Sequence, residues 1–168
     1  MMNAPHKPRL LLRALDERDK DFYTDLYADP EVMRSIGEPW SAKTAGDAFF
    51  LACDANKKAD ADFRCWLILS AEGFKIGIAA LMKRVSNVEL GIMVAPEWQR
   101  RGVGSLVLEM LVRLAFEEHG SVQILCRHRH GNEAWTRLMA RSRFSQDMSI
   151  ECASDLRAWR FIGEDKNT

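Results

Sequence analysis

Apolar residues recur along this chain with two different periods, and the changes of period delimit its elements. Two-residue alternation, or a short apolar run between turns, predicts strands at residues 9–14, 63–69, 75–82, 88–94, 122–127, 144–150 and 156–162. Apolar positions three or four apart predict helices at residues 19–28, 32–36, 41–57, 102–118 and 132–142. The leucines of residues 9–14 are also compatible with a helix.

Polar residues and glycines support these boundaries. Asp16 and Ser41 are N-cap residue types that stand just before two of the helices. Gly37 interrupts the second helix, and Gly120 follows the long helix as a C-terminal stop. The pair at 72–73 predicts a turn, so the strands on either side should form a hairpin.

The order of elements is strand, three helices, three strands, helix, strand, helix and two strands. The strand–helix–strand unit in the middle is expected to cross over and pair in parallel. The fold class predicted is therefore α/β, with one mixed sheet and helices on both faces. Its 168 residues suit a single domain at 1–168, with loose termini at 1–8 and 164–168.

Composition narrows the function only slightly. Hydrophobic residues make up 47% and charged residues 29%, as in ordinary globular proteins, and the formal net charge is +0. No overall field therefore favours nucleic acid or an anionic membrane as a partner. The start lacks the apolar run of a signal peptide, and no stretch reaches transmembrane length. The cysteines, with no Cys-x-x-Cys pair, indicate reduced thiols and a cytoplasmic protein.

The most informative stretch follows the strand at 88–94. It reads Gln99-Arg100-Arg101-Gly102-Val103-Gly104 and opens the long helix. A helix N-terminus offers free N–H groups and partial positive charge, and glycine lets an anion approach the main chain. A Walker A string is absent, and a dinucleotide fingerprint fails because Val107 takes its third glycine position. Two interpretations remain: a phosphate-binding site, or glycines that merely mark the start of the helix.

The loop resembles the pyrophosphate loop of the GNAT N-acetyltransferases, Gln/Arg-x-x-Gly-x-Gly/Ala. Gln99, Gly102 and Gly104 fill every specified position, and the order of elements resembles that fold across nearly the whole chain. Residues 10–13 and 29–33 look like the branch that includes the ribosomal-protein N-terminal acetyltransferases. The resemblance implies a three-layer fold with acetyl-CoA as co-substrate. Its pyrophosphate would lie on the main-chain amides of four residues, Arg101, Gly102, Val103 and Gly104, with Arg100 adding charge at the rim.

In this family the strand before the loop bulges and pairs with the pantetheine arm. By resemblance, Ile92, Met93 and Val94 would do so here, and an amide near Met93 would stabilise the oxyanion. Glu89 is a candidate base that removes a proton from the acceptor amine, directly or through water. It lies on the same strand side as Gly91 and Met93 by two-residue counting. A solvated strand carboxylate is the alternative.

A second motif begins at Asn132 and matches the family at asparagine, leucine and phenylalanine. Asn132 is either a CoA contact or a simple N-cap. Three departures stand out: Trp135 replaces a small residue, Met139 replaces a tyrosine that is a general acid in many members, and Arg143 replaces a glycine. Trp135 would narrow the CoA channel or merely pack.

The run Cys126-Arg127-His128-Arg129-His130 invites a metal reading, because alternate residues of a strand share a face. No fourth ligand is evident nearby, so we expect a solvated basic loop and no metal. With Arg137, Arg141 and Arg143 it forms a basic patch that would meet the CoA 3′-phosphate, an acidic acceptor or water.

These observations favour an N-acyltransferase that moves an acetyl group from acetyl-CoA to a primary amine by direct attack. The acceptor would be a small-molecule amine or a peptide or protein N-terminus, recognised by residues near 29–40. The main alternative is an inactive CoA-binding sensor or assembly subunit, and a nucleic-acid-binding module is disfavoured. We expect the thiol to leave without a protein acid, unless Tyr23 or Tyr27 reaches it. Monomer and homodimer both remain open.

Overall fold

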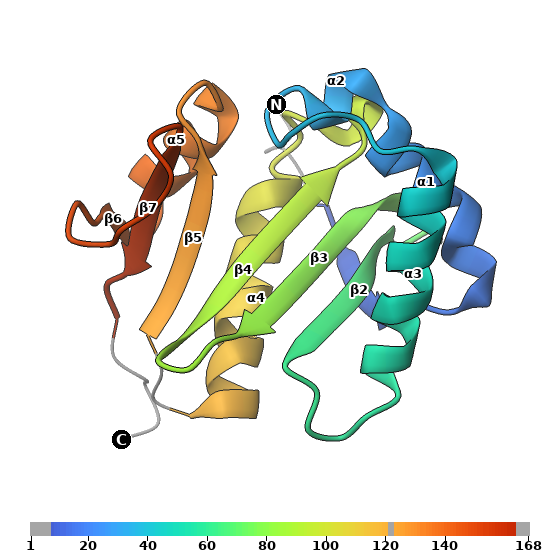
Figure 1. Cartoon of the computed structure of the whole chain (residues 1–168), viewed down its shortest axis with the longest axis horizontal. Helices are drawn as coiled ribbons and strands as arrows, with labels where there is room; N and C mark the ends of the chain where they lie inside the picture. Colours follow the sequence, from blue (N-terminus) through green and yellow to red (C-terminus); the bar gives the residue numbers. More distant parts are fainter. Residues whose placement is uncertain (1–7, 121–122, 164–168) are drawn as a thin grey trace, which may run out of the picture.

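Seven strands form one mixed sheet, with order β1-β2-β3-β4-β5-β7-β6 (Figure 1). The computed structural model describes residues 8–120 and 123–163, so the expected loose termini lie, apart from Pro8, outside the described residues. The strands are β1 Leu10–Ala14, β2 Phe63–Ser70, β3 Lys75–Lys83, β4 Asn87–Val94, β5 Gln123–Arg129, β6 Phe144–Gln146 and β7 Leu156–Phe161.

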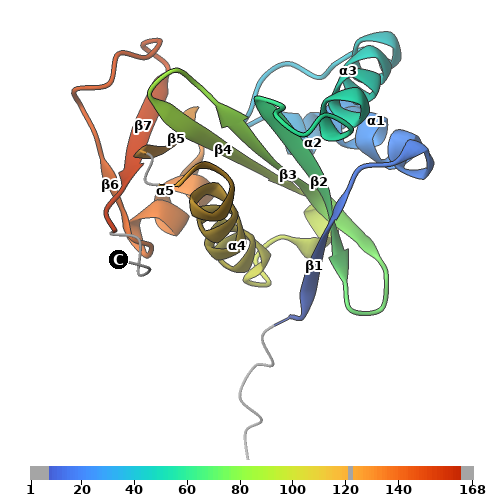
Figure 2. The same cartoon turned by 90° about the horizontal axis from the view of Figure 1, so that it is seen from below.

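Helices cover both faces of the sheet, which confirms the predicted α/β class and its three layers (Figure 2). One face carries α1 Lys20–Ala28, α2 Pro30–Met33 and α3 Ala42–Asn56, and the other carries α4 Val103–His119 and α5 Glu133–Ala140. Two short 3₁₀ turns, η1 Glu17–Asp19 and η2 Pro96–Trp98, precede α1 and the loop before α4. No helix in the described part of the chain is long and apolar enough to span a membrane.

The helix starts differ in how they are capped. The side chains of Asp16, Asp29, Ser41 and Asn132 each accept a hydrogen bond from an N–H of the following turn, as N-cap residues do. Helices α1 and α4 have no such side-chain cap, but α1 continues directly from the turn η1 that Asp16 caps, whereas α4 begins at Gly102, which has no side chain. The longest helix of the fold therefore begins with N–H groups that remain available to a ligand.

Alternation along β4 divides two hydrophobic cores. Val88 and Leu90 pack with α4 in one cluster, whereas Met93 packs with α1 and α3 in the other. The predicted assignment of Glu89 to the same strand side as Met93 is thereby confirmed. Beside the second cluster the buried carboxylate of Asp19 anchors the N-terminal region to β1 and β3 through ion pairs.

The sheet is nearly divided in the middle. Strands β4 and β5 run in parallel, as predicted, but they pair at only three positions, ending at Glu89 opposite Leu125. Beyond this point β4 continues against β3 as far as Val94, and β5 continues against β7 as far as Arg129. The two strands thus separate and leave a wedge-shaped gap between their C-terminal ends, from which the chain continues into α4 and α5.

Three sequence-based boundaries were wrong. Helix α2, predicted at 32–36, lies at Pro30–Met33. Strand β6 is shorter than the predicted 144–150, since its ladder with β7 ends at Gln146. Strand β5 is longer, and its alternation buries Cys126 and His128 completely or nearly so. The expected solvated loop at 126–130 is therefore incorrect for these two residues, because the ladder with β7 continues through them.

Candidate active site

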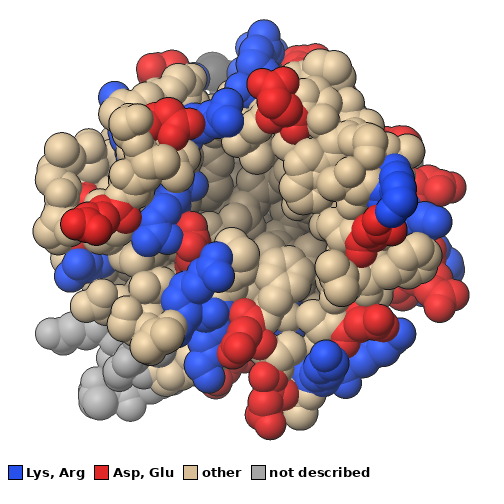
Figure 3. Space-filling model, viewed as in Figure 1, with Lys and Arg blue, Asp and Glu red and all other residues tan. Residues whose placement is uncertain are grey.

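A cavity of about 500 Å³ occupies the wedge between β4 and β5. Figure 3 shows it as a hollow at the centre of the molecule, with basic side chains gathered along one side. Its lining comes from four segments: the α2 region, the end of β4, the loop before α4, and α5. The residues are Glu31, Val32, Arg34, Ser35, Ile36, Ile92, Met93, Val94, Trp98, Gln99, Arg100, Gly102, Val103, Gly104, Ser105, Asn132, Ala134, Trp135, Arg137, Leu138 and Arg141.

The loop before α4 has a backbone suited to an anion. Arg100 and Gly102 have positive φ angles of 60° and 79°, a conformation that curls neighbouring N–H groups toward one side. The first intrahelical bond of α4 is donated by Leu106 to Gly102, so the amides of the preceding turn have no helical partner. Every residue predicted for the pyrophosphate loop lines the cavity except Arg101, whose guanidinium lies 5.1 Å from the Trp98 ring centroid.

The parted edge of β4 presents main-chain groups to the cavity, but not those of Met93. Ala95 donates its N–H to a carbonyl of β3, and antiparallel ladders alternate, so Met93 also bonds toward β3. A Cβ on Gly77 of β3 would collide with the Met93 carbonyl oxygen, which confirms this direction. The main-chain groups of Ile92 and Val94 therefore face the wedge. The Met93 N–H therefore points toward β3 and not into the wedge.

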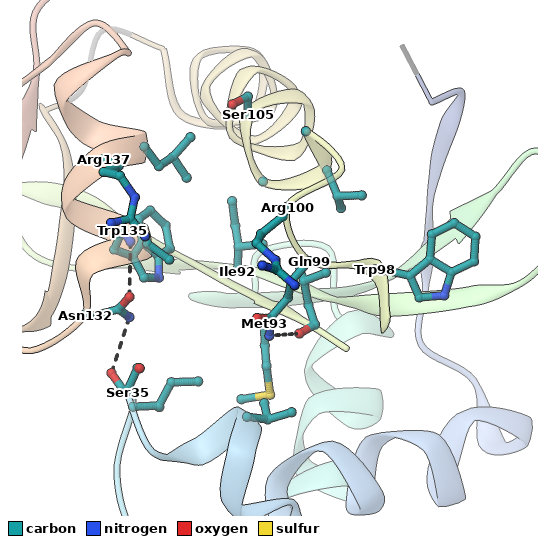
Figure 4. A pocket seen from close by; sticks show the side chains of 18 of the residues that line it. Ser35, Ile92, Met93, Trp98, Gln99, Arg100, Ser105, Asn132, Trp135 and Arg137 are labelled. Atoms are coloured by element: carbon teal, nitrogen blue, oxygen red, sulfur yellow. Dashed lines mark hydrogen bonds between the residues drawn. The ribbon is translucent and has the colours of Figure 1, made fainter. Parts of the chain in front are cut away.

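Gln99 has a role that its motif position alone did not reveal. Its side-chain Nε2 donates a hydrogen bond of 3.0 Å to the Val94 carbonyl oxygen (Figure 4). This contact ties the loop to the end of β4. The Val94 carbonyl oxygen is therefore already bonded to Gln99, whereas the Val94 N–H takes no part in this contact.

Glu89 lies where the two strands separate and is held by arginines. Arg127 Nη1 donates to Glu89 Oε2 at 2.7 Å, and Arg84 Nε is 3.7 Å from the same oxygen. The Glu89 side chain is 13% exposed and does not line the cavity itself. The space beside it is open, because a Cβ built on Gly91 would meet no atom within 4 Å.

Helix α5 forms the opposite wall. Asn132 is 5% exposed, caps the helix by accepting from the Trp135 N–H, and donates through Nδ2 to the Ser35 carbonyl at 3.4 Å (Figure 4). Asn132 is therefore an N-cap that also lines the cavity, and its contact with CoA stays a prediction. Met139 is fully buried in the core and does not line the cavity.

The predicted basic patch separates into parts with different environments. Arg137 and Arg141 line the cavity, whereas Arg127 pairs with Glu89. Arg143 lies over the Phe161 ring at 5.1 Å, so it has a packing contact instead of facing the cavity. Among the residues the structure describes, no group of three or more histidine, cysteine or acidic side chains is placed to hold a metal ion.

Sequence reasoning located α2 only as part of a broad acceptor segment. Glu31, Arg34 and Ser35 line the cavity, and Glu31 is the one acidic residue among the lining residues described. The signal that was available is the Asp29–Pro30 helix start, which fixes where this charged helix begins. Tyr23 and Tyr27 lie elsewhere, in the core behind α1, and burial raises the pKa of both phenols.

A parted parallel strand pair, followed by a Gly-x-Gly loop and an uncapped helix, defines the class of acyl-CoA-binding folds that the loop motif resembles. Comparison with known proteins agrees with this class. A family model described as an acetyltransferase (GNAT) domain matches residues 9–145. The chain therefore belongs to the GNAT acetyltransferase family, which supports the expectation of an acetyl-CoA-dependent N-acetyltransferase.

Solved structures show the same fold at low sequence identity. An acetyltransferase from Agrobacterium tumefaciens is 20% identical with a TM-score of 0.80, and the match covers 97% of each chain. Spermidine N-acetyltransferase from Vibrio cholerae, solved with CoA and spermine, is 18% identical, with a TM-score of 0.72 over 90% of this chain and 92% of that one. The ribosomal-protein alpha-N-acetyltransferase RimL is 15% identical, with a TM-score of 0.74 over 95% and 92%.

Proposed function

We propose that this protein transfers an acetyl group from acetyl-CoA to a primary amine by direct attack in the wedge between β4 and β5. The observation that carries the proposal is the uncapped start of α4 at the mouth of a cavity lined by a parted strand edge. Phosphates would accept from the amides at 101–104, and the pantetheine arm would lie along Ile92 and Val94. Arg100, Arg137 and Arg141 would offset the charge of the nucleotide.

In the proposed reaction the neutral amine attacks the thioester carbonyl carbon, the C–S bond breaks, and CoA leaves as a thiolate. Glu89 would take the amine proton, directly or through water. Its position supports this role, since it shares a sheet face with Gly91 and Met93 and the space over Gly91 is open to an acceptor. The N–H groups of Ile92 and Val94 face the wedge and are the candidate donors to the oxyanion.

The acceptor would enter from the α2 side, where Glu31 and Arg34 stand at the cavity. A small-molecule amine and a peptide or protein N-terminus both fit the proposal. Neighbours of the same fold include enzymes named for spermidine and for a ribosomal protein, so both classes of acceptor belong in the test.

The test is a panel of polyamines, amino acids, aminoglycosides and peptides incubated with acetyl-CoA. Acetylated product is read by its mass shift, and free thiol is measured in parallel. One acceptor that gains an acetyl group with equal release of thiol would support the proposal. Calorimetric binding of acetyl-CoA with no transfer to any acceptor would instead favour the CoA-binding sensor, an alternative that the buried Met139 keeps open. No binding would refute both.

A further inference from the structure

Helix α5 and its N-cap residue present one face to the cavity. Asn132, Trp135 and Leu138 lie three residues apart along one row of that face, and Ala134, Arg137 and Arg141 line the cavity beside them. Leu138 Cδ2 lies 3.4 Å from the position of a Cβ on Gly104, at the phosphate-loop end, while Asn132 reaches Ser35 at the α2 end. The indole of Trp135 is therefore between the proposed phosphate site and the proposed acceptor site (Figure 4).

A buried imidazole lies behind this indole. The ring of His128 is nearly parallel to that of Trp135, with centroids 6.3 Å apart and planes 7° apart, and nearly parallel to that of Trp159 at 6.2 Å and 20°. His128 and Trp159 are 5% and 7% exposed. We call these three residues the aromatic cluster.

Hydrogen bonds fix His128 at both nitrogens. The Trp159 Nε1–H donates to His128 Nε2 at 2.8 Å, and His128 Nδ1 is 2.8 Å from the Arg129 carbonyl oxygen. A carbonyl only accepts and an indole N–H only donates, so the imidazole must be neutral with its proton on Nδ1. Its ring plane is thereby set, although none of these bonds involves the cavity.

We propose that His128 is a positioning residue of the acyl-CoA site: it holds the Trp135 indole as a fixed wall beside the pantetheine arm. The inference rests on the proposed acetyl-CoA function, because only an extended donor would lie along that wall. It also explains why a large aromatic residue is tolerated at position 135. The indole is kept flat against the cluster instead of filling the channel.

The arrangement should depend on pH. Protonated His128 would place an Nε2–H against the Trp159 N–H, so the bond between them would be lost. Burial lowers the pKa of the His128 imidazole, and the nearby charges of Arg157 and His130 act in the same direction, whereas its bond to the Arg129 carbonyl opposes them. Arg129 itself is 3.6 Å from Asp155. The change is therefore expected below pH 6.5, and Trp135 should respond with it.

Nuclear magnetic resonance tests the cluster without any ligand. Indole N–H signals are assigned with single Trp→Phe variants and followed from pH 7.5 to about 4.5. The Trp159 signal should lie downfield, as for a bond to imidazole, and it should move with the same midpoint as the Trp135 signal. Signals that do not move, or that move with unrelated midpoints, would overturn the proposal.

Kinetics with two donors test the role in binding. His128→Gln keeps an acceptor for Trp159 but loses the ring, whereas Trp159→Phe keeps a ring but loses the N–H donor. Each should raise the donor KM about three- to tenfold, the range for one aromatic pair, with kcat little changed. The same factor should appear with acetyl-CoA and with S-acetylpantetheine, which lacks the nucleotide.

Two further variants separate this role from others. Arg100→Ala should raise KM for acetyl-CoA but not for S-acetylpantetheine, which has no phosphate to contact. Leu67→Ala destabilises the opposite core and should leave both KM values unchanged. Unchanged KM in both His128→Gln and Trp159→Phe would refute the proposal. Failure of the wild type to bind acetyl-CoA would refute the proposed function. The titration of the indole N–H signals would then still test whether His128 and Trp159 set the position of Trp135.

Discussion

Gly104 allows binding at the loop to be tested apart from stability. It is the second residue of α4, and its φ is not positive, in contrast to Gly102 at 79°. A replacement at Gly102 would strain the left-handed backbone, so loss of binding there would be ambiguous. At Gly104 an added Cβ meets only Leu138 Cδ2, at an ordinary contact distance of 3.4 Å.

The expected magnitudes follow from this geometry. Ala at residue 104 should leave the free energy of unfolding unchanged or raise it by up to about 1 kcal/mol, since glycine is a poor helix residue. The branched side chain of Gly104→Val extends toward the cavity and should deny phosphate at least two main-chain donors. Hydrogen bonds to charged groups contribute about 1.5–3 kcal/mol each, so affinity should fall by about 10²–10⁴-fold.

Calorimetry with CoA measures the affinity, and urea unfolding measures the stability of the same preparations. Gly104→Ala is the matched control and should bind within a few-fold of wild type, as the family motif admits alanine at this position. Gly104→Val with wild-type affinity and wild-type stability would show that phosphate does not bind at the start of α4, and the reasoning from the uncapped helix would fail.

Three other predictions address the chemistry and the fold. Glu89→Gln should keep acetyl-CoA affinity but lower kcat about a hundredfold or more, as loss of a general base does. Glu31→Gln, at an acidic residue that lines the cavity, is the comparison variant. Equal kcat for Glu89→Gln and wild type would make Glu89 a structural partner of Arg127. Tyr23→Phe and Tyr27→Phe should leave the pH–rate profile unchanged, with a rise through one base ionisation and then a plateau up to pH 10, because burial raises the pKa of both phenols and neither lines the cavity. A high-pH limb that disappears in either variant would reveal a tyrosine acid. Asp19→Ala should cost about 1–3 kcal/mol in urea unfolding, because it removes a buried carboxylate that accepts from Arg13 and Lys75. Burial raises the pKa of Asp19, but its hydrogen bonds with Arg13, the Asp16 amide and Lys75 outweigh burial and lower the pKa. The stabilisation by Asp19 should therefore be present above about pH 4 and be lost as the pH falls through the folded pKa. An Asp19→Ala penalty that is the same at pH 3 and pH 7 would contradict this assignment.

Local patterns predicted most of this fold because they report local physics. Alternation placed Glu89 and Met93 on one face of β4, and cap residues such as Ser41 marked helix starts, since both depend on neighbours in the chain. The candidate pyrophosphate loop could be recognised from Gln99 and Gly102, because the positive φ of residue 102 favours glycine.

Long-range pairing was the part that sequence did not reveal. The position where β4 and β5 separate is set by the ladder ending at Leu125, and no residue pattern in either strand announces it. The ladder phase with β3 moved the candidate oxyanion donor away from Met93. His128 looked like part of a solvated loop because its burial depends on β7 and α5, which contribute Trp159 and Trp135.

The parting of β4 and β5 also bears on how the molecule holds together. Only three residue pairs join the half-sheet β1–β4 to the half-sheet β5–β7–β6, so cooperativity across that seam depends largely on α4 and the core beneath it. The two halves are then natural units of partial opening, with the seam as the place where amide hydrogens escape to solvent first. A ligand that lies in the wedge and bonds to both sides would fasten these units to each other. Its binding energy would thus appear as slower hydrogen exchange in strands that it never touches.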